Sequence, residues 1–533
     1  MMSPRSIVAG ATALHAAVGA WIATSITGPL LAIDDLAYLS MGRTLAGGGA
    51  SPLSAQPPYG VLYPALLAPG WLVGFDESQM IVFAQVVNAL LGAALLPVLY
   101  VLLRRLTDAS GGRALAAAAI GASLPAALLT GSIVWTERLL PLLVALAVLA
   151  LLRLADAPTS LRAVEVSLLA AALYATHPRT IVVAIVVIAA GMWIVAASRD
   201  RVALTALWLS GHAGLALAEL ARRALASETF GAGATYDGAD LASRRGLDDV
   251  PEMLVHATAS VAYLALATAG FAVLGAIMLF RQPSAAAFYA AMFAATVAVA
   301  GWFLTGVGRG DAYLHGRYIE VLAPSLVALG IVGAHRLSLR VSMAALTLTV
   351  LAAGLVAAWA GPGNNWAGSR TPVMMLGVEV SGAPFGAMTF RPELATAVAL
   401  VAGILILAAA RGAAWMPALV AGAVIAVAVV SGAESIDSLR DNTTVGQVQA
   451  AMDGVEVEEL FIDSDRLPST LVAAMAWEVG FDRTTTEISI DMTHLLLPTG
   501  AVPPPGSLLV SEIGVAVDEA GVKTGGGVLW QLG

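Results

Sequence analysis

Long apolar runs, separated by short polar connections, make up most of the chain. Thirteen of these runs are long enough to cross a hydrocarbon core of about 30 Å as helices. We therefore predict about thirteen membrane-spanning helices. The predicted spans are residues 6–30, 78–103, 113–133, 135–154, 162–177, 178–197, 203–222, 255–280, 284–306, 317–334, 340–360, 393–411 and 413–432.

The charges in the connections predict the orientation of these spans. Arginine concentrates in alternate connections, which read "RRLTDASGGR", "RLADAPTSLR", "SRDR", "RQ", "HRLSLR" and "ARG". Short cytoplasmic loops carry an excess of Arg and Lys, so we assign these connections to the cytoplasm. The acidic connections and the acidic C-terminal tail then face outward, which requires an odd number of spans.

The segment "YGVLYPALLAPGWLVGF", residues 59–75, is apolar enough to span but contains Pro64 and Pro69. Proline inside a helix removes a backbone hydrogen bond and bends or breaks the helix. A span here would also reverse the orientation of every later loop. We therefore predict an interfacial or re-entrant segment on the outer side of the membrane.

The pattern changes near residue 433, where the apolar runs shorten to strand length and acids become frequent. "VEELFID", "TTTEISID", "SLLVSE" and "GVLWQL" are typical of strands, and "LPSTLVAAMAWEVG" is typical of an amphipathic helix. We predict an all-α polytopic membrane protein with a small α/β C-terminal domain. The transmembrane domain covers 1–432, with outer loops near 31–77, 223–254 and 361–392, and the soluble extracytoplasmic domain covers 433–533.

Composition narrows the chemistry. Of the 533 residues, 59% are apolar and 12% are charged, and the formal net charge is −9. The chain has no cysteine, which excludes disulfides, thiolate metal sites and nucleophilic thiols. The N-terminal apolar stretch is longer than the core of a signal peptide, so we expect it to remain as the first span. The preference for Arg over Lys suggests a GC-rich genome, such as an actinobacterial one.

Candidate chemistry begins in "LLAIDDLAYLSMGRTL", residues 30–45, where Asp34 and Asp35 follow the first span. In a short surface helix Tyr38 shares their face, because residues three and four positions apart are neighbours. Acids at the start of a helix also complement its dipole and cap its free N–H groups. A capping role is therefore the alternative to a chemical one.

Further charged residues gather on the same predicted side of the membrane. "ATHPRTIV" and "GRGDAYLHGRYIEVLAP" each lead into a span, and the short connection after "GSIVW" adds an acid and a base. A single Arg at a helix end is usually an interfacial anchor. Together with the Asp pair, these residues predict a polar cavity with acids for proton abstraction and cations for a phosphate. The candidate residues are His177, Arg179, His315, Arg317, Tyr318, Glu320, Glu137 and Arg138.

An Asp-Asp pair in the first outer loop, followed by Tyr and a short amphipathic helix, resembles the signature of the glycosyltransferase C superfamily. These are polytopic enzymes that use polyprenyl-phosphate sugars. "PPYGVLYPALLAP" is similar to the Pro-Tyr-Pro stretch of protein-mannosyltransferase-like and aminoarabinose-transferase-like members, and "GRYIEVLAP" to the Arg-Tyr start of one of their spans. The resemblance covers the architecture of residues 1–430, whereas the motifs cover only these short stretches.

The resemblance implies an inverting transfer of a sugar from polyprenyl phosphate to a hydroxyl of a cell-envelope glycan, a lipid or a protein. The reaction would take place at the outer face of the plasma membrane, and no nucleic acid is expected as a partner. Asp34 would be the base, with Asp35 beside it, and Arg317, Arg179 and His177 would bind the donor phosphate. If a metal is used, Mg²⁺ or Mn²⁺ would bind Asp34 or Asp35. Arabinofuranose and mannose are the sugars that the resemblance suggests.

Two other function classes stay open. A transporter or flippase would also have many spans, but with broken helices and ionisable groups near the middle of the bilayer. His212 and Glu219, inside the predicted span 203–222, are the main residues of that kind. A non-catalytic envelope-assembly protein would be the other alternative, because it could keep the same fold without turnover.

Overall fold

The computed structural model describes residues 4–24, 32–49, 59–231, 246–306, 314–360 and 391–441, and seven short strands between 460 and 531. Most of the predicted outer loop 361–392 lies outside the described residues, as does the predicted helix at 467–480.

Helices occupy the place of every predicted span. In the first half of the chain they are α1 (Pro4–Thr24), α2 (Ala32–Leu45), α3 (Leu62–Leu72), α4 (Glu77–Leu106), α5 (Gly111–Ala122), α6 (Pro125–Leu129), α7 (Leu139–Asp156), α8 (Ser160–Thr176), α9 (Ile181–Ser198) and α10 (Arg201–Phe230). In the second half they are α12 (Val250–Ala267), α13 (Phe271–Leu279), α14 (Pro283–Leu304), α15 (Ala323–Arg336), α16 (Leu339–Ala360), α19 (Pro392–Ala410) and α20 (Met416–Asp441). Short 3-10 turns are η1 (Thr130–Ser132), η2 (Thr136–Arg138), η3 (Pro178–Thr180), η4 (Leu247–Asp249) and η6 (Glu320–Leu322).

Nine of the described helices are long and apolar enough to cross a membrane, or ten if the bent pair of α5 with α6 and η1 is one span. The two parts of that pair meet at 58°, so the predicted span 113–133 is broken. The predicted span 255–280 divides into α12 and α13 at Gly270, whose φ of +78° favours glycine. The helices confirm the prediction of an all-α polytopic membrane protein.

Two shorter helices follow α1. α2 carries Asp34 and Asp35 in its first turn, where carboxylates complement the helix dipole, and it ends two residues before Gly47, whose φ is +87°. α3 has 11 residues, so at about 1.5 Å per residue it is about 16 Å long. This length is too short to cross the hydrocarbon core, in agreement with the prediction that 59–75 does not span.

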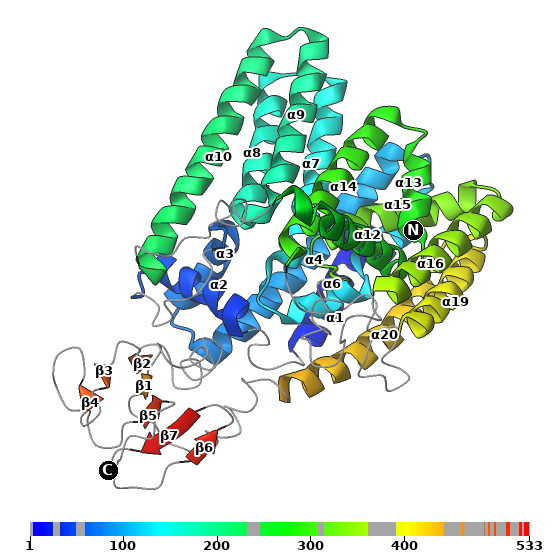
Figure 1. The fold of residues 1–533 in the computed structure, drawn as a ribbon. Helices are drawn as coiled ribbons and strands as arrows, with labels where there is room; N and C mark the ends of the chain where they lie inside the picture. The colour runs from blue at the N-terminus through cyan, green and yellow to red at the C-terminus, as the bar shows by residue number, and fades with distance from the viewer. Residues whose placement is uncertain are drawn as a thin grey trace.

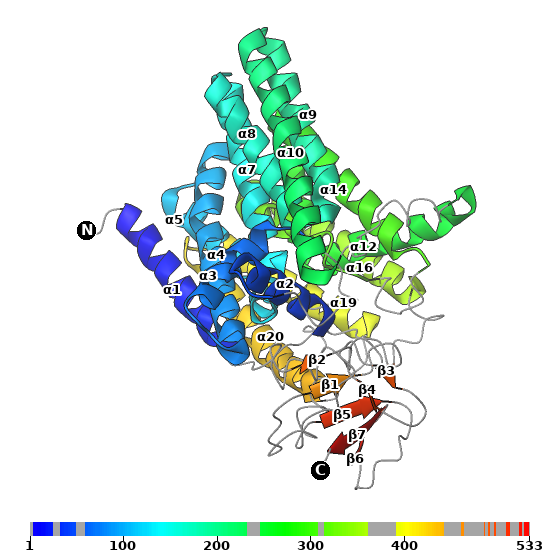
Figure 2. The same cartoon turned by 90° about the vertical axis from the view of Figure 1, so that its left-hand side faces the viewer.

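The long helices pack in groups. α7, α8, α9 and α10 lie side by side in both views, and α1 lies along α4 (Figures 1 and 2). Glycines bring α13 and α15 together: a Cβ on Gly330 would lie 2.0 Å from the carbonyl oxygen of Phe271, and one on Gly275 would lie 1.9 Å from that of Leu326. The two backbones are therefore in direct contact, as small residues allow between membrane helices.

The described strands of the C-terminal part form a five-stranded mixed sheet in the order β2-β1-β5-β7-β6. β1 pairs in parallel with β2 and β5, whereas β7 is antiparallel to β5 and β6. β3 and β4 form a separate antiparallel pair. The strand bounds are β1 (Leu460–Ile462), β2 (Thr484–Thr485), β3 (Ser489–Ile490), β4 (Leu495–Leu496), β5 (Leu508–Ser511), β6 (Val522–Thr524) and β7 (Gly527–Gln531).

Candidate active site

The two acids of α2 face different neighbours. Asp34 Oδ1 accepts a hydrogen bond from the Tyr59 hydroxyl at 2.6 Å, and Asp34 Oδ2 pairs with Arg317 Nη1 at 2.7 Å. Asp35 is fully buried, and its Oδ1 accepts a hydrogen bond from the backbone N–H of Val134 at 2.8 Å. Asp34 therefore faces the candidate site, whereas Asp35 ties α2 to the segment between η1 and η2.

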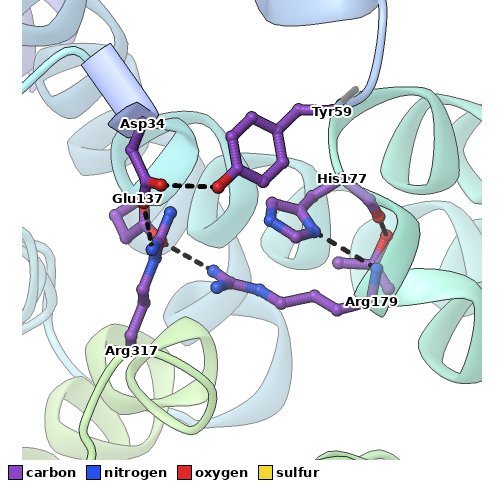
Figure 3. Close-up of polar contacts among 7 residues, drawn as sticks. Asp34, Tyr59, Glu137, His177, Arg179 and Arg317 are labelled. Carbon is purple, nitrogen blue, oxygen red and sulfur yellow. Dashed lines mark hydrogen bonds and ion pairs between the residues drawn. The ribbon is translucent and has the colours of Figure 1, made fainter. Parts of the chain in front are cut away.

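Glu137 joins the two arginines of the site (Figure 3). Its Oε1 accepts hydrogen bonds from Arg179 Nη2 at 2.7 Å and from Arg317 Nε at 2.5 Å, while its Oε2 has no hydrogen-bond partner among the described residues. All three side chains are at most 10% exposed, so the ion pairs are poorly screened by solvent. Glu137 lies in η2 just before α7, and Arg179 lies in η3 just before α9, so short turns at helix starts bring them together.

Arg317 uses two of its three guanidinium nitrogens in these ion pairs. Its Nη1 binds Asp34 and its Nε binds Glu137, but its buried Nη2 has no hydrogen-bond partner in the described part of the chain. The Cζ atom lies 4.0 Å from the ring centroid of Trp135, whose face stabilises the cation. Because a buried N–H without a partner is unfavourable, Nη2 is a donor available to a ligand.

His177 closes the end of α8 and supports Arg179. Its Nδ1 accepts a hydrogen bond from the backbone N–H of Arg179 at 3.2 Å, and its ring centroid lies 5.2 Å from that of Tyr59. Burial, together with the charges of Arg179 and Arg317, holds the pKa of His177 well below its usual range. His177 is therefore neutral, so it shapes the turn that holds Arg179 and does not add a positive charge.

Three tyrosines support the carboxylate of Asp34. Tyr38 stacks on Tyr59 with a centroid distance of 4.7 Å and meets Tyr63 edge-on at 5.2 Å. Tyr63 donates a hydrogen bond from its hydroxyl to Asn88 Oδ1 at 2.9 Å. This stack fixes the chain before α3 against α2, and so keeps the Tyr59 hydroxyl beside Asp34.

The other predicted residues divide into two groups. Tyr318 lies against Arg179, whose Cζ is 5.1 Å from its ring centroid, and the ring of His315 lies 5.2 Å from that of Tyr318. Arg138 instead extends toward α4, where a Cβ on Gly92 would lie 2.2 Å from its Nη2. The structure thus places Arg138 in helix packing and outside the predicted cavity, while the adjacent Glu137 faces the site.

Asp34 and Asp35, the candidate ligands of Mg²⁺ or Mn²⁺, both have protein partners. Asp34 is taken up by Tyr59 and Arg317, and the Oδ1 of Asp35 is bound to a backbone N–H. Within the described ranges, no group of three or more His, Asp or Glu side chains is arranged to hold a metal ion without further ligands.

A charged pocket and an apolar cavity meet at two helix breaks. Glu137, Arg179, Arg317 and Glu320 line the charged pocket. An apolar cavity of about 570 Å³ lies among residues of α12, α13, α15, α19 and α20. Pocket and cavity share four lining residues, Leu124, Pro125, Ala267 and Thr268. These residues lie at the break between α5 and α6 and at the end of α12, so the charged pocket has an apolar neighbour.

Sequence reasoning missed three residues of this site. Tyr59 lies in the "PPYGVLYPALLAP" motif and binds Asp34, Trp135 directly precedes η2, and Tyr263 of α12 donates a hydrogen bond to Glu320. A lone aromatic residue beside a charged pair was the available signal at Trp135. No local signal identifies Tyr263, because its partner is 57 positions away in the sequence.

A search of family models and of curated proteins finds no match to the chain. Among solved structures, ArnT from Cupriavidus metallidurans bound to undecaprenyl phosphate matches with a TM-score of 0.52 at 12% identity, covering 98% of this chain and 97% of that one. The apo state of ArnT from the same organism matches with the same TM-score and coverage at 15% identity. The chain therefore has the fold of these two structures over nearly its whole length.

Proposed function

We propose that this chain is an inverting membrane glycosyltransferase that moves a sugar from a polyprenyl-phosphate donor to an acceptor hydroxyl. The position of Arg317 carries the proposal. This residue binds Asp34 and Glu137, its buried Nη2 has no hydrogen-bond partner among the described residues, and its side chain lines a pocket beside an apolar cavity. A candidate base, a donor for a phosphate and space for a lipid chain thus lie next to one another.

Asp34 is the base in this proposal. It takes the proton of the acceptor hydroxyl while the hydroxyl oxygen forms a bond to the anomeric carbon of the sugar. Without a ligand, Asp34 is paired with Arg317, so a phosphate that binds Arg317 weakens this pair and frees the carboxylate. Tyr59 holds the other oxygen of Asp34, which keeps the carboxylate oriented.

The leaving group is the polyprenyl phosphate. As the bond between the anomeric carbon and the phosphate oxygen breaks, the electron pair stays on the phosphate and its negative charge grows. Arg317 and Arg179 stabilise this charge more in the transition state than in the ground state. Because the oxygen attacks from the opposite face in a single displacement, the anomeric configuration inverts and no sugar–enzyme bond forms.

The apolar cavity supports a lipid donor. ArnT was solved with undecaprenyl phosphate bound, and this chain has the same fold. We propose that a polyprenyl chain lies in the cavity of about 570 Å³, with its phosphate at Arg317. The four lining residues that the cavity shares with the charged pocket mark the path between the lipid chain and its headgroup.

The acceptor is a glycan, a lipid or a protein of the cell envelope, and the sugar is arabinofuranose or mannose. These assignments rest on the resemblance of the sequence motifs. We place the site and the C-terminal domain at the outer face of the plasma membrane, because the acidic connections lie on that predicted side. The C-terminal domain packs there or binds the acceptor.

The test is transfer of a labelled sugar from synthetic polyprenyl-phosphate donors by the purified protein in nanodiscs. Asp34→Asn should lower turnover by about 10²- to 10⁴-fold, the usual effect of losing a general base, with donor binding retained. Asp108→Asn is the matched control, because the side chain of Asp108 is 99% exposed and lies away from the site. If Asp34→Asn kept a turnover near the wild-type value, Asp34 would cap helix α2 and would not be the base.

A lipid transporter or flippase is the second candidate, and one observation favours it. α5 and α6 form a broken helix, and His15 Nδ1 lies 3.1 Å from Ser123 Oγ at that break. Broken helices with polar groups inside the membrane are typical of transporters. A vesicle assay for movement of fluorescent lipid across the bilayer separates the two functions, because the glycosyltransferase requires no such movement.

A further inference from the structure

Glu320 is a carboxylate that the proposed transfer does not use. It lies in η6, before α15, and it lines the charged pocket with Arg179, Arg317 and Glu137. The hydroxyl of Tyr263 donates a hydrogen bond to its Oε1. This hydrogen bond leaves Oε2 outside it, on a side chain that lines the pocket.

The ring of Tyr263 is held in this position by the chain before η6. A Cβ on Gly316 would lie 2.2 Å from ring carbon Cζ of Tyr263, so only glycine lets the backbone pass so close to the ring. The structure therefore fixes the Tyr263 hydroxyl against Glu320 from two sides, through α12 and through Gly316.

The charges of the site do not favour an anion when every acid is ionised. Asp34, Glu137 and Glu320 supply three negative charges, and Arg179 and Arg317 supply two positive charges. His177 adds none, because its pKa lies well below its usual range. The site then carries a net charge of −1, and the phosphate of a lipid would meet Glu320 on the same pocket wall as the two arginines.

We propose that Glu320 takes up a proton when the phosphate of a lipid-linked ligand enters the pocket, and donates it in a hydrogen bond to that phosphate. The proton cancels one negative charge and converts a repulsive contact into an attractive one. Tyr263 is a positioning residue, because it holds the carboxyl group through Oε1 and leaves Oε2 for the ligand. This inference rests on the proposed function, since it assigns a role in binding the same donor.

The surroundings of Glu320 suit this role. Burial raises the pKa of Glu320 to about 7, the hydrogen bond from Tyr263 and the charge of Arg179 oppose the rise, and the charge of Glu137 adds to it. Arg317 also lines this pocket. A bound phosphate is a further negative neighbour and raises the pKa again. We therefore expect affinity for the ligand to be highest at low pH, where Glu320 is protonated. Above about pH 7 it should fall, by up to about tenfold per pH unit.

The test is equilibrium binding in nanodiscs between pH 5.5 and 9, with a synthetic polyprenyl-phosphate sugar as the probe. Its phosphodiester keeps one charge over this range, so any change in affinity belongs to the protein. Glu320→Gln should bind at pH 8.5 with the affinity that the wild type has at low pH, and its affinity should not change with pH. Glu165→Gln, a matched change in an ion pair with Arg153 away from the pocket, should keep the wild-type profile.

Tyr263→Phe provides a second variant for the case that Glu320→Gln folds poorly. Loss of the Tyr263 hydroxyl removes a group that stabilises the ionised carboxylate, so the fall in affinity should begin at a higher pH. A wild-type affinity that is constant with pH would overturn the inference, and so would a Glu320→Gln profile with the wild-type slope. Absence of wild-type binding at every pH would instead contradict the proposed donor and thus the proposed function.

Discussion

At the residue scale, Arg317 has two possible roles, an interfacial anchor or a clamp for the donor phosphate, and Arg317→Lys distinguishes them. Lysine also extends to a membrane interface, so an anchor tolerates Arg317→Lys. Lysine cannot bind Asp34, Glu137 and a phosphate through a planar fork of three nitrogens. We expect Arg317→Lys to weaken binding of polyprenyl phosphate and lower turnover, each by about ten- to a hundredfold, the effect of one or two charge-assisted hydrogen bonds.

Binding in nanodiscs and turnover with the same donor measure these two effects. Arg336→Lys is the control, because Arg336 pairs at 3.4 Å with an exposed acid at the other end of α15. If Arg317→Lys kept both affinity and turnover, Arg317 would be an anchor, and Arg179 would be the next residue to test.

Several site residues could be predicted from their chemistry alone, but their pairing could not. Asp34, Arg179 and Arg317 stand out as charges at the ends of apolar runs. The bond between Asp34 and Arg317 joins positions 283 residues apart, and no local pattern contains that information. Which of Asp34 and Asp35 faces the site depends on how α2 is rotated about its axis. That rotation is seen only in the structure, where Asp34 binds Tyr59 and Asp35 binds the Val134 amide.

At the scale of elements, the chain before α3 lies flat against the end of α8. A Cβ on Gly60 would lie 2.2 Å from the carbonyl oxygen of Ala175, so Gly60→Ala must push the adjacent Tyr59 away from Asp34. We expect lower thermal stability and a loss of turnover of about tenfold or more, as small displacements in a site produce. Gly49→Ala is the control, because a Cβ there has no neighbour within 4 Å.

Gly60→Ala should lower both turnover and the thermal unfolding midpoint. Gly49→Ala should change neither of them. Unchanged turnover of Gly60→Ala would show that the backbone adapts without moving Tyr59. In that case, the contact between α8 and the chain before α3 would have no role in orienting the Asp34 carboxylate.

Helices were easier to predict than their breaks. Apolar length alone located a helix at each predicted span, because a hydrocarbon core requires such runs. The same criterion joined α5 with α6 and α12 with α13, since apolarity continues through both breaks. Pro125 and Gly270 are the local signals at these breaks, but proline and glycine are also common inside unbroken membrane helices.

At the scale of the whole molecule, the predicted orientation can be tested with single cysteines in this cysteine-free chain. Gly49 and Ser78 flank the segment of α3 and are exposed, and Ser110 is exposed beyond the other end of α4. An impermeant thiol reagent applied to intact spheroplasts should label Gly49→Cys and Ser78→Cys, because α3 does not cross. It should label Ser110→Cys only after lysis.

The three positions distinguish the possible errors. Labelling of Gly49→Cys without Ser78→Cys would mean that residues 59–75 cross the membrane. Labelling of Ser110→Cys alone would show that the whole orientation is the reverse of the predicted one. The reason for a lipid-linked donor at the outer face would then no longer hold.

The cavity beside the charged pocket has a kinetic consequence for the proposed reaction. Its walls come from membrane helices, so a polyprenyl chain reaches it by sideways diffusion within the bilayer and never passes through water. The effective concentration of the donor is then its surface density among the other lipids. The reaction rate therefore depends on the mole fraction of donor in the leaflet, and it does not depend on the volume of the surrounding solution.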